Sequence, residues 1–219
     1  MDISQEKTRQ RLVEAAGEVF AEQGYRTATV REICARAGAN VAAVSYHFGD
    51  KETLYAAVLR YAHGHAIAKY PPHMGLPPDA PAEARLHSFV LAFLLRLMDE
   101  GRPAWHAKMM SREIAEPTGA LDMLVDEQVK PLFGYVRQVM IDLLGPKAPD
   151  ETVRLCCFSV VGQCLFYHFG QPVMRRMFPQ RTIGVKDAAR VAEHITRLTL
   201  SGVRAVAVGG NMGRKGGAK

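Results

Sequence analysis

The side chains best suited to recognition chemistry lie between residues 40 and 47, in the stretch NVAAVSYH. Small or hydrogen-bonding side chains allow a helix to approach the base edges of a DNA major groove, so this stretch predicts DNA contact. The candidate residues within it are Asn40, Val41, Ala42, Ser45, Tyr46 and His47. Thr29, Arg31 and Lys51 flank it and are candidates for contacts with phosphate groups. Arg31 has an alternative role as a solvated side chain that pairs with Glu32 or Asp2.

Two short helices joined by a tight turn are expected to position these side chains. Thr29 and Glu32 fit a capping box at the start of the first helix, and Gly38 suits the left-handed residue that ends it. Asp50 can cap the helix that follows the second one. The apolar residues expected to face inward are Val30, Ile33, Cys34 and Ala37 in the first helix and Val41, Val44 and Phe48 in the second. This spacing is typical of a helix-turn-helix, although any helical hairpin fits it equally well.

The sequence adds a family resemblance to this spacing. TVREICARAG followed by GANVAAVSYHFGDKETLYAAVL resembles the N-terminal domain of the TetR family of one-component transcriptional regulators. The resemblance extends from Gln5 to about Tyr61, and it includes the HF-x-x-K segment after the second helix. It implies an all-α fold and binding to double-stranded DNA.

The resemblance also implies a role for individual positions. Residues that match Tyr46, His47 and Lys51 often contact the DNA backbone in this family, and those that match Val41 and Ala42 face the bases. Many members carry an aromatic residue, which contacts phosphate, where this chain has Ser45. We therefore expect that contact to be weaker here, or to be made by the neighbouring tyrosine.

Length and composition are those of a globular protein with one large or two small domains. The chain has 219 residues, of which 48% are hydrophobic and 23% are charged. The net charge of +6 suits a partner of nucleic acid, but residues 1–51 contain seven basic and seven acidic residues. The DNA-binding prediction therefore depends on where the charges lie, and not on a net positive charge of residues 1–51.

The cysteines and the N-terminus predict a cytoplasmic protein with free thiols. Cys34, Cys156, Cys157 and Cys164 have no C-x-x-C spacing, and the first ten residues are polar, unlike a signal peptide. The longest uncharged run, residues 155–174, is interrupted by glutamine, histidine and proline. It predicts a buried helix and no membrane span.

The remaining chain shows helical periodicity and no strand alternation. A first helix is expected over residues 4–23, with an apolar stripe of Leu12, Val13, Ala16, Val19 and Phe20. A proline-rich break at residues 70–78 follows a fourth helix over about residues 50–65, and helices are expected over 82–99, 104–115, 121–144, 150–168 and 185–202. Pro131 is expected to bend the helix over 121–144. The predicted fold class is all-α, with a three-helix helix-turn-helix head and a larger helical-bundle domain for ligand binding and dimerisation. The predicted domains are residues 1–50 and 51–208, followed by a disordered basic tail over 209–219.

Other chemistry is weakly indicated. His63, His65 and His73 lack a neighbouring cysteine or a well-spaced carboxylate, so we expect surface or boundary histidines and no metal site. Cys156 and Cys157 are expected to be small buried residues, with redox sensing as the alternative. The sequence has no nucleophile elbow, phosphate loop or cofactor signature, so neither an enzyme nor a cofactor is predicted.

The body carries a second resemblance, to the C-terminal domain of a TetR subgroup, in the segment REIAEPT at residues 112–118. In that family the body binds a small molecule among its middle helices and forms a homodimer through its last two. Candidate pocket residues for an apolar or amphipathic effector, which fit a plain core equally well, are Phe89, Phe93, Trp105, Met109, Met110, Phe133 and Met140. Candidate residues of the dimer interface are Phe158, Val161, Leu165, Ile195 and Leu198.

These features together predict a dimeric regulator that binds a near-palindromic operator and is released by its effector. Repression is expected, and activation is not distinguished from it by the sequence. The rival interpretations are a helical enzyme and an interaction scaffold without DNA binding.

Overall fold

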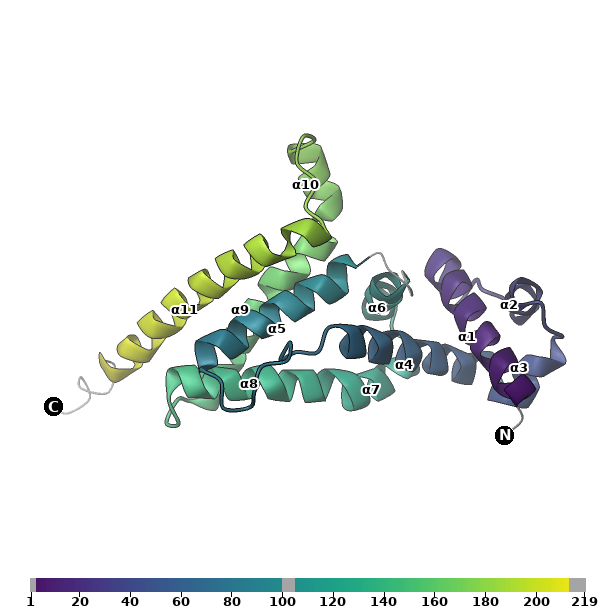
Figure 1. Cartoon of the computed structure of the whole chain (residues 1–219), viewed down its shortest axis with the longest axis horizontal. Helices are drawn as coiled ribbons and strands as arrows, with labels where there is room; N and C mark the ends of the chain where they lie inside the picture. The colour runs from purple at the N-terminus through teal and green to yellow at the C-terminus, as the bar shows by residue number, and fades with distance from the viewer. Residues whose placement is uncertain (1–2, 100–104, 213–219) are drawn as a thin grey trace. The chain divides into compact units, whose positions relative to one another are not determined.

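The computed structural model describes residues 3–99 and 105–212, and every regular element in these ranges is a helix (Figure 1). The predicted all-α class is therefore confirmed. The chain divides into two compact units that each take residues from separate parts of the sequence. We call them the head unit, within residues 1–69 and 100–130, and the body unit, within residues 70–99 and 131–219.

The head unit contains more of the chain than the three predicted helices. Its helices are α1 (Ile3–Gln23), α2 (Val30–Ala37), α3 (Ala42–Phe48), α4 (Lys51–Lys69), α6 (His106–Ala115), α7 (Ala120–Leu124) and the π-helix η1 (Val125–Val129). The compact units thus do not follow the boundary expected between residues 50 and 51, because α6 and α7 pack against α1 and α4. The functional division of the chain stays a prediction.

The head core explains why α6 belongs to this unit. The predicted apolar stripe of α1 is buried, and the Phe20 ring meets Tyr55 of α4 edge to face at 4.9 Å. The Trp105 ring lies directly over Gly17 of α1, where a Cβ atom would be 2.2 Å from the ring. Only glycine leaves room for this contact. The small residue in α1 and the large one before α6 therefore fit each other.

The body unit contains the remaining helices. They are α5 (Ala82–Met98), α8 (Lys130–Leu144), α9 (Asp150–Phe169), α10 (Gln171–Met177), the 3₁₀ helix η2 (Val185–Asp187) and α11 (Ala188–Met212). Helices α5, α9 and α11 pack against one another around an apolar core. The largest fully buried side chains of this core include Leu86, Leu94, Met140 and Ile195.

Prolines change the predicted helices in two places. The helix expected over 121–144 is interrupted by η1, which ends immediately before Lys130 and Pro131. Proline has no N–H to donate to the fourth preceding carbonyl, and a π turn is a common adjustment to such a defect. Pro172 lies in the first turn of α10, where its missing N–H has no helical partner to lose. This short helix was missed.

The last helix is longer than predicted. It begins after η2 and continues to Met212, so residues 209–212 of the predicted disordered tail are helical. The rest of that tail, residues 213–219, lies outside the described residues.

Candidate nucleic-acid interface

Local hydrogen bonds fix the start of α2. Thr29 has an extended backbone, and its Oγ1 accepts a hydrogen bond from the N–H of Glu32 at 3.2 Å. This is the first half of the predicted capping box. The carboxylate of Glu32 is engaged elsewhere, by Nε2 of Gln23 at 2.5 Å. Thr29 therefore keeps its hydroxyl proton available for an outside acceptor while its oxygen caps the helix.

The turn after α2 is held from two sides. Gly38 has φ 60° and ψ 40°, the left-handed conformation expected, and the N–H of Ala39 reaches Cys34 O at 2.9 Å. Arg11 of α1 donates from Nε to Ala37 O at 3.0 Å and from Nη2 to Gly38 O at 2.8 Å. These bonds satisfy carbonyls that a helix end leaves without partners. Arg11 therefore positions the turn, a role that no local pattern in the sequence indicates.

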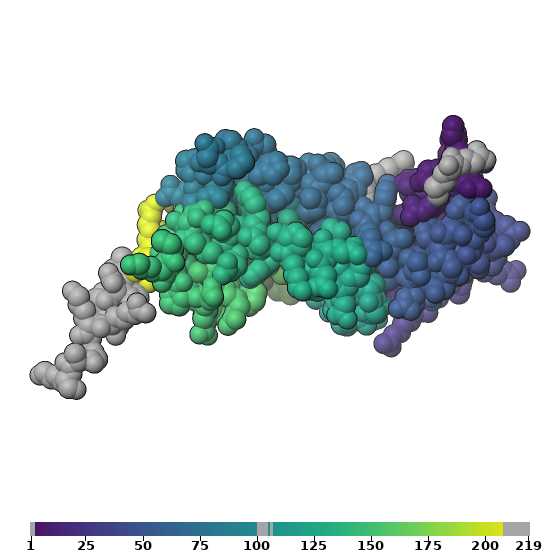
Figure 2. Space-filling view, turned by 90° about the horizontal axis from the view of Figure 1, so that it is seen from below, coloured from purple at the N-terminus to yellow at the C-terminus, as the bar shows by residue number. Residues whose placement is uncertain are grey.

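Helix α3 presents a small, exposed surface. Asn40 Oδ1 accepts from the N–H of Ala42 at 3.1 Å and so caps the helix start. Val44 and Phe48 are buried as predicted, but Val41 is 49% exposed, so its assignment to the inward face was wrong. The surface formed by the outward residues of α3, which we call the α3 surface, consists of Val41, Ala42, Ser45 and Tyr46. Residues of α2 to α4 form the blue-purple surface in Figure 2.

The two aromatic candidates, Tyr46 and His47, differ in exposure. Tyr46 is 70% exposed, whereas His47 is partly buried and its ring meets Tyr46 edge to face at 4.9 Å. The tyrosine hydroxyl is thus the more accessible hydrogen-bonding group.

Lys51 has a structural role that the sequence did not reveal. Its Nζ donates to Ala28 O at 2.9 Å and lies 3.5 Å from Arg26 O, and the ammonium group lies 4.7 Å from the centre of the Tyr25 ring. These contacts hold the segment that leads into α2. One of the three ammonium protons remains for a phosphate, so the lysine positions α2 as well as being a candidate contact.

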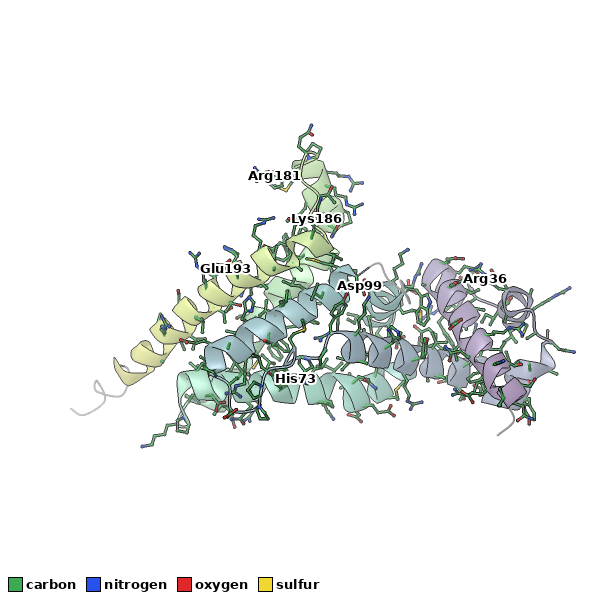
Figure 3. The ribbon with its side chains drawn as sticks, in the orientation of Figure 1. Arg36, His73, Asp99, Arg181, Lys186 and Glu193 are labelled. Carbon is green, nitrogen blue, oxygen red and sulfur yellow. The ribbon has the colours of Figure 1, made fainter. Side chains whose placement is uncertain are left out.

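Two arginines of α2 differ in their partners. Arg31 is exposed, and within the described residues it forms no ion pair. The alternative pairing with Glu32 is therefore not found. The other alternative partner, Asp2, lies outside the described residues. Arg36, which is labelled in Figure 3, donates to both carboxylate oxygens of Glu22, at 2.9 and 3.0 Å. The Arg36 guanidinium lowers the pKa of the Glu22 carboxyl from its ordinary value. Arg31 is therefore the cation of α2 that is free to meet DNA.

The REIAEPT segment is built into the head unit. Glu113 is fully buried, and its carboxylate accepts from the Tyr55 hydroxyl at 2.8 Å and from the N–H of Thr118 at 2.9 Å. Burial, with Glu113 beside it, raises the pKa of Tyr55. Arg112 donates to Ala21 O at 3.1 Å and to Glu22 O at 3.0 Å, close to the end of α1. The segment therefore joins α6 to both α1 and α4 through polar contacts, of which the one between Glu113 and Tyr55 is buried.

The predicted pocket residues are divided between the two units. Trp105 and Met109 are buried in the head core, whereas Phe89 and Met140 are buried in the body core. Phe93 and Phe133 are partly buried against that second core, and Met110 is half-buried on α6. Their assignment to one effector pocket stays a prediction.

Two surface hollows do occur, one in each unit. The hollow of the head unit, of about 340 Å³, lies between α1 and α4 and is lined by Arg9, Val13, Arg60 and Tyr61, among others. The hollow of the body unit, of about 400 Å³, is lined mainly by α11 residues, with Tyr167 and Ile183. Glu193, labelled in Figure 3, is one of the α11 residues.

The predicted dimer residues are only partly on the surface. Ile195 is 1% exposed and belongs to the body core, so its assignment to a dimer interface was wrong. Val161 and Leu165 are half-buried, whereas Phe158 and Leu198 are exposed. Further large apolar side chains of α9 are also exposed, namely Leu155, Phe166 and Phe169.

Helix α9 is less buried than expected. It is the one helix of the described ranges that is long and apolar enough to cross a membrane by length and composition, a test that core helices of soluble proteins also pass. Only 22% of its most apolar window is buried, so the prediction of a buried helix was wrong for a single protomer. An apolar face of this size needs a cover.

The burial of the cysteines and histidines agrees with the predictions in part. Burial raises the pKa of Cys157 to about 11, and it also raises the pKa of Cys156, so both thiols stay protonated near neutral pH. This weighs against redox sensing. His63 is buried, where a surface or boundary position was expected. The described residues contain no group of three or more potential metal ligands.

Two family models match separate parts of the chain, which together make up most of it. Residues 12–58 match the family model for bacterial regulatory proteins of the tetR family. Residues 82–203 match the model for the C-terminal domain of the HTH-type transcriptional dual regulator CecR. CecR of Shigella flexneri is 28% identical over 179 residues, which are 78% of this chain and 80% of the relative.

Solved structures agree on the fold. The fatty acid degradation regulator FadR from Bacillus halodurans matches with a TM-score of 0.64 and 17% identity, over 88% of this chain and 98% of that chain. The TetR family regulator PfmR from Thermus thermophilus matches with a TM-score of 0.62 and 20% identity, over 87% of this chain and 97% of that chain.

Proposed function

Because the chain belongs to the TetR family of transcriptional regulators and carries a CecR-type C-terminal domain, we propose that it binds a near-palindromic operator as a homodimer and leaves it when an effector binds. DNA binding through the helix-turn-helix follows from the family. The operator symmetry, the dimer and the effector are the proposed parts. A protein of this kind acts in the cytoplasm, where its DNA is.

The α3 surface supports base reading at Val41 and Ala42. Both residues are exposed at the start of α3, the end of a recognition helix that contacts base edges. Ser45, Tyr46 and Arg31 are proposed to contact phosphates, and the half-buried His47 to contribute less. The fixed turn at Gly38 is the single observation that carries the proposal, since it sets the angle between α2 and α3.

Homodimerisation is supported by the exposed apolar side chains of α9 and α11. Phe158 and Leu198 are each more than half exposed, and α9 and α11 pack against each other within the body unit. A second copy of the chain would cover both helices at once, as a two-fold axis requires. Two α3 surfaces related by this axis would meet successive major grooves.

Release by an effector requires that binding in the C-terminal domain affects the DNA-binding helices. Residues of the CecR-type domain supply one, because α6 is bonded to α1 through Arg112 and to α4 through Glu113. An effector that moves α6 would disturb both helices. A difference of about 1–3 kcal/mol in its affinity for the two states is sufficient for regulation.

The sign of regulation has two candidates. Repression is the first, because a dimer on an operator excludes polymerase without further contacts. A dual role is the second, because the Shigella relative is named a dual regulator.

Fluorescence anisotropy with a fragment of the chain's own promoter tests the proposal. We expect the fragment to bind at least about 1000-fold more tightly than a scrambled duplex at the same salt concentration. Replacement of Ala42 by methionine should alter the ranking of operator variants. Equal binding of both duplexes, or none, would instead favour an interaction scaffold or an enzyme.

A further inference from the structure

Arg96 is a buried cation that has no counter-ion among the described residues. It lies on α5 in the body unit and is 3% exposed. Its Nη1 donates to Tyr70 O at 2.6 Å, but its Nη2 is buried and has no hydrogen-bond partner. None of the ion pairs within residues 3–99 and 105–212 includes it. Burial lowers the pKa of this guanidinium to about 10, so it stays charged.

Another arginine of the same helix shows what Arg96 lacks. Arg85 is also largely buried, and it donates both to Ala80 O and to the carboxylate of Asp142. Removing a charge from water is expensive unless an opposite charge and hydrogen bonds replace the water. Arg85 has such a replacement within the fold, whereas the described part of the chain gives Arg96 one neutral carbonyl.

The neighbours of Arg96 on α9 do not provide the missing charge. Burial raises the pKa of Cys164 to about 12, so this thiol is protonated. Burial lowers the pKa of His168, which is therefore neutral near pH 7 and carries no negative charge in either form. None of the described residues therefore supplies a counter-ion to Arg96.

Aromatic rings continue from Arg96 along α5. The guanidinium carbon lies 5.5 Å from the centre of the Phe93 ring, and Phe93 stacks on Phe89 at 5.9 Å. Phe89 stacks in turn on Tyr135 of α8 at 6.2 Å, and the Tyr135 hydroxyl is buried without a partner. Two turns of helix separate Phe89 from Arg96, which is about 10 Å. The row is thus a positive group, an apolar stretch and a polar hydroxyl.

We propose that Arg96 binds the carboxylate of the effector, and that the effector is an amphipathic monocarboxylate whose chain replaces part of the packing along Phe93 and Phe89. This inference rests on the proposed function, since it names the effector class of the body. Nη2 of Arg96 donates to the carboxylate, and the far end of a chain of about 10 Å reaches Tyr135.

The hydrogen bond from Arg96 to the Tyr70 carbonyl connects the proposed site to the end of α4. Tyr70 is the first residue after α4, and its carbonyl is a weaker acceptor than a carboxylate. A carboxylate therefore competes with Tyr70 for the guanidinium. Effector binding changes the segment in which α4 ends.

The test compares octanoate with octanamide, which has the same chain and no charge. Isothermal titration of the full-length protein, without DNA, measures both dissociation constants. We expect octanamide to bind about 10- to 100-fold more weakly than octanoate, as for loss of a charge-assisted hydrogen bond. Arg96→Met should weaken octanoate binding by a similar factor and leave octanamide binding unchanged. The same variant should melt at an equal or higher temperature without ligand, because it removes an unpaired buried charge.

Two further variants keep the test decisive. Arg197→Met changes an arginine of the body hollow and should leave octanoate binding unchanged. If Arg96→Met does not fold, Arg96→Lys keeps the charge but moves it, and should weaken octanoate binding several-fold with a normal circular dichroism spectrum.

Equal binding of octanoate and octanamide would overturn the inference, as would loss of octanoate binding in Arg197→Met alone. Octanoate binding that depends on Arg96 but leaves operator affinity unchanged would support the site and contradict effector release. Loss of operator binding in the unliganded wild-type protein would contradict the proposed function and leave the carboxylate result standing.

Discussion

The head and body units differ in how they hold a buried charge and in how much apolar surface they expose. In the head, the buried carboxylate of Glu113 accepts from two residues, and Lys51 donates to backbone carbonyls. In the body, three buried polar atoms of the described residues have no hydrogen-bond partner, and α9 exposes large apolar side chains. The three atoms are Arg96 Nη2, Tyr135 OH and Thr196 Oγ1.

The difference indicates where a second molecule would bind. Glu113 in the head has hydrogen-bond donors within its own unit, whereas Arg96 in the body has one neutral carbonyl, so the proposed effector is placed beside Arg96. Large exposed apolar faces commonly mark interaction sites, so the proposed second copy is placed on α9. The proposed DNA contacts, in contrast, lie on the exposed α3 surface of the head.

The largest expected effect is on the Glu113 cluster. Glu113→Ala removes the acceptor of the Tyr55 hydroxyl and of Thr118 in a fully buried place. We expect the free energy of unfolding to fall by about 3 kcal/mol, measured by urea denaturation. Glu116→Ala, at an exposed position of the same segment, should change it by less than about 0.5 kcal/mol. Similar values for the two variants would show that the head does not depend on this cluster.

The next effect concerns the open face of the body. Phe158→Glu places a charge on the exposed side of α9 and should raise the dissociation constant of the dimer about 100-fold or more, since a charge buried in an interface lacks a partner. Sedimentation velocity over a range of concentrations measures it. Met177→Glu, on the exposed surface of α10, is the control and should leave the dimer unchanged. A wild-type chain that sediments as a monomer at all concentrations would refute the dimer.

A smaller effect separates the two arginines of α2. Arg31→Ala should weaken binding to every duplex about 5- to 10-fold and lower the slope of log K against log salt by about 1, because one phosphate contact is lost. Arg36→Ala should leave that slope unchanged, since Arg36 is paired with Glu22. An equal change of slope in both variants would mean that the pairing does not keep Arg36 from DNA.

The smallest effect is expected at Lys51. Lys51→Met removes the bonds to the carbonyls before α2 and should lower the free energy of unfolding by about 1 kcal/mol. Thermal denaturation monitored by circular dichroism measures it. If stability is unchanged while DNA binding and its salt slope fall as in Arg31→Ala, Lys51 acts on phosphate alone.

Short-range features were predictable from the sequence. The cap at Thr29, the left-handed Gly38 and the cap at Asp50, which accepts from the N–H of Thr53 at 2.7 Å, each depend on a few adjacent residues. The all-α class follows from helical periodicity in the same way. The family resemblance over residues 5–61 agrees with the family model that matches residues 12–58.

Two features that depend on long-range packing differ from what the sequence predicted. The sequence could not place Trp105 over Gly17, and so it could not show that α6 belongs to the head. It counted Ile195 as surface because an apolar residue on an amphipathic helix fits a core and an interface equally well.

The amino-acid sequence by itself thus determined the helices, the turn of the helix-turn-helix and the family, since caps and periodicity act within about one helical turn. Only the tertiary structure decided that Arg11, Lys51 and Arg112 hold backbone carbonyls far along the chain, and that Arg96 lacks a counter-ion among the described residues. The physical reason is that a charged side chain looks the same in the sequence whether its partner is a carbonyl, a carboxylate, water or a ligand. Packing of distant segments selects among them.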